Sequence, residues 1–173
     1  MNRNYYRLAV LVVNIAPDVL RKKVTEGFRT DFSKDWKEGG GSGKDMIKRY
    51  VTNAKLLTLN HAERQVLESS RMKDFDITLC CSLLWAMRTL ERVEFDAVTE
   101  LRKIRNEYAH CSKMSNMDDA KFKQLWLRAS RALTSLDHRL QKELDALYDY
   151  TEKENREKVS STLRARPSSL LCL

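Results

Sequence analysis

The sequence predicts an all-α fold, an up-and-down helical bundle of four principal helices with short accessory helices. Apolar residues recur at helical spacing through most of the chain, and no stretch alternates with a period of two. Only two prolines interrupt 173 residues, and four of the five glycines lie together at 39–43. This length suits one domain with a sizeable core, which we place at residues 1–154.

The first helix is expected from about residue 4 to residue 32. Pro17 should kink or interrupt it near Ala16, because proline has no backbone N–H. The apolar run at 8–16 could pass for a signal peptide, but it is short, contains Asn14 and lacks a small-x-small cleavage site. A buried first helix is the better interpretation, and no other stretch of the sequence could span a membrane.

Residues 39–43 read Gly-Gly-Gly-Ser-Gly, a composition found nowhere else in the chain. Such a segment is typical of a flexible linker. We interpret it as an engineered replacement of a longer, exposed loop.

The middle of the chain predicts two short helices and one central helix. The short ones cover about 44–51 and 60–69, the latter starting at an asparagine N-cap with Glu63 at the capping-box position. Asp74 or Asp76 caps the central helix, which is apolar nearly all round and therefore belongs inside the bundle. Its apolar residues are Ile77, Leu79, Cys80, Leu83, Leu84 and Met87.

Two further helices complete the bundle. One begins near Phe95 or Asp96 and ends around Cys111, and a polar hinge follows at 112–117. Asp118 caps the last helix, whose nearly heptad apolar stripe predicts continuity to about residue 153. This stripe exceeds what a small bundle covers, which suggests a partner helix from a second copy; packing along the chain's own first helix is equally consistent. Residues 155–173 lose the periodicity and are expected to be a flexible tail.

The charge balance favours anionic partners. Lys and Arg total 32 against 24 Asp and Glu, a net charge of +8. Basic residues form no run, so folding must assemble any positive patch, and each cation taken singly is equally consistent with a solvated mixed-charge face. The candidates are Arg102, Lys103, Arg105, Lys113, Lys121 and Lys123.

Cysteine and histidine spacing predicts no metal site and no cofactor. The four cysteines lack C-x-x-C pairs, and the adjacent pair lies in the apolar central helix. The three histidines are far apart and form no ligand pair on one helix face. We expect a reducing, cytoplasmic compartment. The residues are Cys80, Cys81, Cys111, Cys172, His61, His110 and His138.

The string Arg-Asn-Glu-Tyr-Ala-His at 105–110 brings a general base, a permanent cation and an amide close together. Asn106 and His110 are four residues apart and share a helix face, while Arg105 lies about 100° round the axis and reaches across with its long side chain. Such a set suits phosphate chemistry. Solvated surface charges, a core Tyr108 and a helix-capping His are the alternative explanation.

The motif and its flanks resemble the HEPN domain, whose signature is R-x(4–6)-H closing a helix. Here R-N-x-x-x-H is followed by a polar break and a Trp-bearing helix. Flanking blocks are similar to the HEPN subfamily first described in the DAZ-interacting RING-type ubiquitin ligase and found in many multidomain innate-immunity proteins. They are Phe-Asp-Ile-Thr-Leu at 75–79, residues 101–106, Phe122-x-x-Leu125-Trp126 and Ala132-Leu133, within a resemblance that covers about residues 4–150.

This resemblance implies an RNA-binding domain and a metal-independent endoribonuclease that works as a homodimer. In metal-free cleavage, His110 would be the base for the 2′-hydroxyl and Arg105 the phosphate clamp. Asn106 would donate to a phosphoryl oxygen or orient His110, with Arg102, Lys103 and Lys113 contacting RNA. One chain supplies a single His in the motif, and the leaving oxygen also needs an acid. The resemblance implies that a second copy completes the site.

A second interpretation is a non-catalytic dimerisation or protein-interaction module of a larger signalling or ubiquitin-ligase-type protein. Domains that resemble this one accompany ubiquitin-ligase, repeat or nucleotide-binding modules, where they serve as platforms. The sequence leaves both interpretations open.

Overall fold

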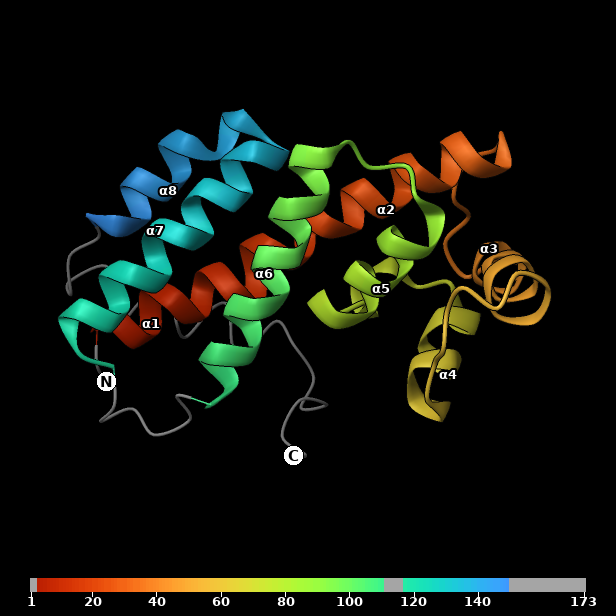
Figure 1. Cartoon of the computed structure of the whole chain (residues 1–173), viewed down its shortest axis with the longest axis horizontal. Helices are drawn as coiled ribbons and strands as arrows, with labels where there is room; N and C mark the ends of the chain where they lie inside the picture. Colours follow the sequence, from red (N-terminus) through yellow and green to blue (C-terminus); the bar gives the residue numbers. More distant parts are fainter. Residues whose placement is uncertain (1–2, 111–116, 150–173) are drawn as a thin grey trace.

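The computed structural model describes residues 3–110 and 117–149. Helices form most of these two ranges and no strand occurs in them, which confirms the all-α class (Figure 1). Lys113, most of the expected hinge at 112–117 and the tail at 155–173 lie outside the described residues. The elements in order are α1 (Arg3–Val10), the π-helical segment η1 (Leu11–Ile15), α2 (Ala16–Phe32), α3 (Ser42–Met46), the π-helical segment η2 (Ile47–Asn53), α4 (His61–Ser69), the 3₁₀ turn η3 (Met72–Asp74), α5 (Ile77–Met87), α6 (Arg92–His110), α7 (Asp119–Leu136), the 3₁₀ turn η5 (His138–Leu140) and α8 (Gln141–Tyr148).

The long first helix has the interruption expected at Pro17. Helix α1 continues through η1 into α2, and the N–H of Ala16 donates to the carbonyl of Leu11, five residues back. Because proline cannot donate and its ring clashes with the preceding turn, a widened π turn just before Pro17 relieves both problems. The apolar side of this helix forms one wall of the core.

The segment at 39–43 differs from the flexible linker that its composition predicts. Gly39 and Gly41 are exposed, but Ser42 and Gly43 are buried at the start of α3. A Cβ atom on Gly43 would lie 1.7 Å from the carbonyl oxygen of Leu67, so only glycine fits. The N–H of Gly43 also donates to the hydroxyl of Ser70 at 2.9 Å. The segment is therefore a packed joint between α3 and α4.

The expected helix caps are present. The Asn60 side chain accepts from the N–H of Glu63 at 2.9 Å, and the Glu63 carboxylate accepts from the N–H of Asn60 at 2.9 Å, a complete capping box. Asp76, rather than Asp74, caps α5, and Asp118 caps α7, at 2.8 and 2.7 Å respectively.

Helix α5 is central, as its apolar sequence predicts. Eight of its eleven residues are buried, including both adjacent cysteines. Burial raises the pKa of the Cys81 thiol to about 12 and that of Cys80 well above its usual value, so both pack as neutral small side chains.

Helix α6 begins at Arg92, three to four residues earlier than expected, and crosses the long first helix at η1, where α1 passes into α2, with α7 on one side and α5 on the other (Figure 1). None of the helices in 3–110 and 117–149 is long and apolar enough to cross a membrane.

The expected continuous helix from Asp118 to about residue 153 is wrong. Helix α7 ends at Leu136, Asp137 is extended with φ −150° and ψ 100°, and α8 follows after η5. The Asp137 carboxylate accepts from the N–H of Arg139 at 3.1 Å and from its guanidinium at 2.8 and 2.6 Å. These local bonds compete with helix continuation, as aspartate side chains commonly do.

Helix α8 consequently folds back along α7 (Figure 1). The Tyr148 ring lies 5.9 Å from that of Phe122 and 5.5 Å from that of Trp126, and Leu144 is fully buried. Arg7 of α1 donates to the carbonyl of Tyr148. The chain itself therefore covers the apolar length that suggested a partner helix.

Candidate nucleic-acid interface

The second half of α6 is fixed to the bundle before its exposed residues begin. Val98, Leu101 and Ile104 are buried in the core. The next two residues after Asn106, Glu107 and Tyr108, attach this part of α6 to two other helices.

Glu107 links α6 to α7. Its carboxylate accepts from Lys121 at 2.8 Å and from Arg128 at 2.7 Å, and Arg128 also binds Glu100 at 2.5 Å. The hydrogen bond from Lys121, followed by that from Arg128, lowers the pKa of Glu107 despite partial burial. Lys121, a candidate cation for the basic patch, is therefore neutralised within the fold.

Tyr108 anchors the same turn to α1. Its ring stacks on that of Tyr5 in α1, with centroids 5.2 Å apart and planes at 29°. Burial, then hydrogen bonding to Tyr5, raises the pKa of Tyr108. Tyr108 packs against the core, as expected.

The other three residues of the motif reach the surface. Asn106 and His110 are exposed and Arg105 is partly exposed. The Arg105 guanidinium donates to the Asn106 side-chain oxygen at 3.4 Å, which draws it toward the Asn106 side of the helix. His110 contacts neither of them through a hydrogen bond or ion pair among the residues described. Arg105 and His110 are five residues apart, about 140° round an ideal helix, so a ligand must bridge them.

Charges on α6 are segregated. All four of its carboxylates are in ion pairs, whereas Arg102, Lys103 and Arg105 form none within 3–110 and 117–149. The uncompensated cations therefore create a positive surface beside the motif. The carboxylate pairs are Glu94 with Lys23 at 2.7 Å, Asp96 with Arg92 at 3.3 Å, and Glu100 and Glu107 with α7.

The remaining candidate cations differ in their environments. The Arg102 guanidinium lies over the Trp85 ring of α5, 4.8 Å from its centroid, so its position is fixed by an aromatic face. Lys103 is exposed on α6, and Lys123 is exposed on α7.

Two aromatic residues near this surface were not expected from the sequence. Phe95 is 44% exposed, and its ring centroid lies 6.3 Å from that of Trp85. The spacing of Phe95, Thr99, Arg102 and Asn106 places them on one side of α6, which was a readable signal. This signal was available even with the helix expected to start near Phe95 or Asp96, but Phe95 then stood at the helix end and was not read with the residues that follow it.

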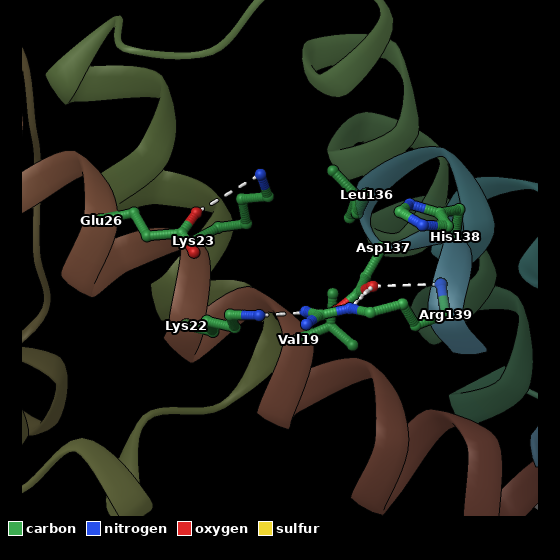
Figure 2. Close-up of a pocket in the computed structure, with 8 residues that line it drawn as sticks. All are labelled: Val19, Lys22, Lys23, Glu26, Leu136, Asp137, His138 and Arg139. Carbon is green, nitrogen blue, oxygen red and sulfur yellow. Dashed lines mark hydrogen bonds and ion pairs between the residues drawn. The ribbon is translucent and has the colours of Figure 1, made fainter.

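Two hollows on the surface of the described residues are lined by no residue of the motif. One, of about 300 Å³, lies between α2 and η5, where Lys22, Lys23 and Glu26 face Asp137 and Arg139 (Figure 2). Its charges are in ion pairs: Lys22 and Arg139 both contact Asp137, and Lys23 contacts Glu26 and, at 2.7 Å, Glu94 of α6. The second, of about 330 Å³, lies between α6 and α7 beside Val93. In the described part of the chain, no three His, Cys, Asp or Glu side chains gather as metal ligands.

The motif is thus an exposed surface on a rigid helix rather than a cleft. It presents an arginine and an amide joined by a long hydrogen bond, an exposed imidazole and two further cations. No protein-family model matches this chain, and neither the search of curated proteins nor that of solved structures found a match.

Proposed function

We propose that this protein binds RNA through the exposed side of α6 and cleaves it without a metal at Arg105, Asn106 and His110. The charge segregation on α6 carries the proposal, because its carboxylates are all neutralised while Arg102, Lys103 and Arg105 stay free for phosphates. Phosphate contacts of this kind supply most of the affinity for nucleic acids.

His110 is the base of the proposed reaction. Its neutral imidazole takes the proton from a ribose 2′-hydroxyl, and the 2′-oxygen attacks the adjacent phosphorus. The bond from phosphorus to the 5′-oxygen breaks, and that oxygen receives a proton from an acid. The products are a 2′,3′-cyclic phosphate end and a 5′-hydroxyl end.

Arg105 and Asn106 stabilise the charge that develops on the phosphoryl oxygens. The guanidinium is permanently charged and offers several N–H donors in one plane. The Asn106 amide, which already accepts from Arg105 through its oxygen, has its NH₂ group free to donate to a second phosphoryl oxygen. The pair acts as one preorganised clamp.

The acid is the element that one motif does not supply. His110 is the only histidine of this surface, and a second copy that faces it would provide another His110 as the proton donor. We therefore propose a homodimer as the active form.

RNA cleavage in EDTA by three variants tests this function. His110→Ala should abolish cleavage and keep most of the RNA affinity, because it removes the base and leaves the cations. Arg105→Ala should weaken both, since a phosphate clamp acts in the ground state and the transition state alike. His138→Ala removes another exposed histidine, on η5, and should cleave like the wild type.

The identity of the new RNA end gives the second readout. Mass spectrometry should find the 2′,3′-cyclic phosphate, because an internal hydroxyl is the nucleophile. Intact RNA across varied sequences and salt concentrations, or equal cleavage by His110→Ala and wild type, would refute the nuclease proposal.

A non-catalytic interaction module is the second candidate function. It is favoured by large apolar side chains exposed on α6 and α7, with Val93 63% and Leu127 51% exposed. This candidate expects no RNA product from any variant and unchanged self-association in His110→Ala and Arg105→Ala.

A further inference from the structure

One side of α6 carries a continuous row of residues that ends at the motif. The row, here called the α6 stripe, consists of Phe95, Thr99, Arg102, Asn106 and His110. Successive members are three or four residues apart, so on an ideal helix all five lie within about 80° of the circumference. Lys103 and Arg105 flank the stripe on its two sides.

The end of the stripe distant from His110 is aromatic. Phe95 is 44% exposed, and its ring centroid lies 6.3 Å from that of Trp85 of α5, over which the guanidinium of Arg102 lies at 4.8 Å. A phenylalanine ring with this much exposed surface contributes little to the core and is of a type on which a nucleobase can stack. The Trp85 ring thus contacts the side chains of both Phe95 and Arg102.

The stripe also lacks negative charge along its length. None of its five members is acidic, and the carboxylates of α6 are held by cations at its sides. The nearest exception is Asp96, which pairs with Arg92 beside Phe95. A polyanion can therefore follow the helix from Phe95 to His110.

We propose that the α6 stripe binds single-stranded RNA, with one base stacked on Phe95 and the following phosphates on Arg102 and Arg105. This inference rests on the proposed function, because it extends the same site toward the start of α6. From Phe95 to His110 the helix rises about 22 Å, room for about four nucleotides of an extended strand. A duplex keeps its bases stacked inside and cannot offer one to Phe95.

Binding of a fluorescein-labelled twelve-nucleotide RNA, measured by anisotropy, tests the role of Phe95. Phe95→Ala should weaken binding about tenfold, the usual size of one lost stacking contact. Phe95→Trp keeps a stacking face and should bind at least as well as the wild type. Val93→Ala is the matched control, since Val93 is more exposed, lies on the same helix and faces α7; binding should change less than about twofold.

The same oligonucleotide as a duplex measures the preference for a single strand. The wild type should prefer the single strand by about tenfold, and Phe95→Ala should remove most of that preference. A 5-iodouracil-labelled strand, irradiated and analysed by mass spectrometry, should crosslink to Phe95 or Trp85.

The outcomes separate this inference from the proposed function. If the wild type binds RNA and Arg105→Ala weakens it, but Phe95→Ala matches Val93→Ala, the stacking site is wrong while RNA binding stands. Equal affinity of the wild type for duplex and single-stranded RNA would likewise refute the stacking site and leave RNA binding intact. If the folded wild type binds no RNA, both proposals are overturned.

Discussion

Glu107 and Tyr108 explain how Arg105, Asn106 and His110 can be exposed and still be held in place. Glu107 ties the turn to α7 through Lys121 and Arg128, and Tyr108 stacks on Tyr5 of α1. Because these two adjacent residues fix this turn of α6 to two other helices, the exposed side chains on either side of them need only local rotation to meet a ligand. Preorganisation of this kind lowers the cost of binding and catalysis.

Gly43 gives a sharp test at the scale of one residue. Gly43→Ala places a methyl group 1.7 Å from the Leu67 carbonyl, so α3 and α4 must separate. We expect the free energy of unfolding to fall by about 3 kcal/mol, at the upper end for overpacking a buried site. Chemical denaturation followed by circular dichroism measures this change.

Gly41→Ala is the control for that substitution. A Cβ atom on Gly41 would meet nothing within 4 Å, and its φ of −84° suits alanine. The free energy of unfolding should change by less than about 1 kcal/mol. A flexible linker would tolerate both substitutions equally, and that result would contradict the packed joint.

Residue types and spacing were enough to select the motif but not to describe its surroundings. The sequence could predict that Tyr108 packs inside, because it lies on the core side of the helix. It could not predict the ion pair of Lys121 with Glu107 or the cation–π contact of Arg102 with Trp85, since each contact joins two different helices. Such pairings depend on tertiary packing, which local patterns do not encode.

Helix ends that are set by side-chain bonds within one turn could be predicted from the sequence. The end of α7 could not, because there the local bonds of Asp137 compete with an apolar periodicity that continues past it. The caps at Asn60, Asp76 and Asp118 use side chains that bond backbone groups within the same turn. Asp137 is the same kind of residue, yet the apolar stripe continued past it and suggested one helix. The local bonds of Asp137 and the packing of Tyr148 on Phe122 together favour the break.

The contact between α6 and α7 should respond to acid through Glu107. Its pKa in the folded protein is lowered from the usual 4.5, so its ion pairs add stability above that pH. This stability is lost as the pH falls through the lower, folded pKa. Glu107→Gln should reduce the free energy of unfolding by about 1 kcal/mol at neutral pH, and the difference from the wild type should shrink below about pH 4.

Urea denaturation at neutral and acidic pH measures the difference in the free energy of unfolding between Glu107→Gln and the wild type at each pH. Glu68→Gln is the control, because Glu68 pairs with Arg64 at 3.8 Å and both side chains are 42% exposed. Glu68→Gln should lower the free energy of unfolding by less than about 0.5 kcal/mol. A Glu107→Gln variant whose loss of stability is the same at both pH values would show that the loss does not come from the charge of the carboxylate.

At the scale of the whole molecule, the fold leaves its charges unevenly placed. The net charge of +8 is distributed so that one side of α6 carries cations that form no ion pair among the described residues, while the carboxylates on its α7 side are paired. The return of α8 covers the apolar stripe of α7 within one chain. Self-association therefore has to use another surface, and the proposed chemistry indicates one where two copies of α6 face each other.

Subunit mixing tests whether two copies build one site. If one His110 is the base and the other is the acid, a dimer of one wild-type and one His110→Ala subunit is inactive. An excess of His110→Ala protein should then suppress wild-type cleavage well below the activity of the wild type alone, because most wild-type subunits pair with the variant. The Val93→Ala protein in the same excess should not suppress it, since it supplies an intact His110. Cleavage that stays proportional to the wild-type concentration, together with a monomeric mass by light scattering at working concentration, would place both proton transfers within one chain.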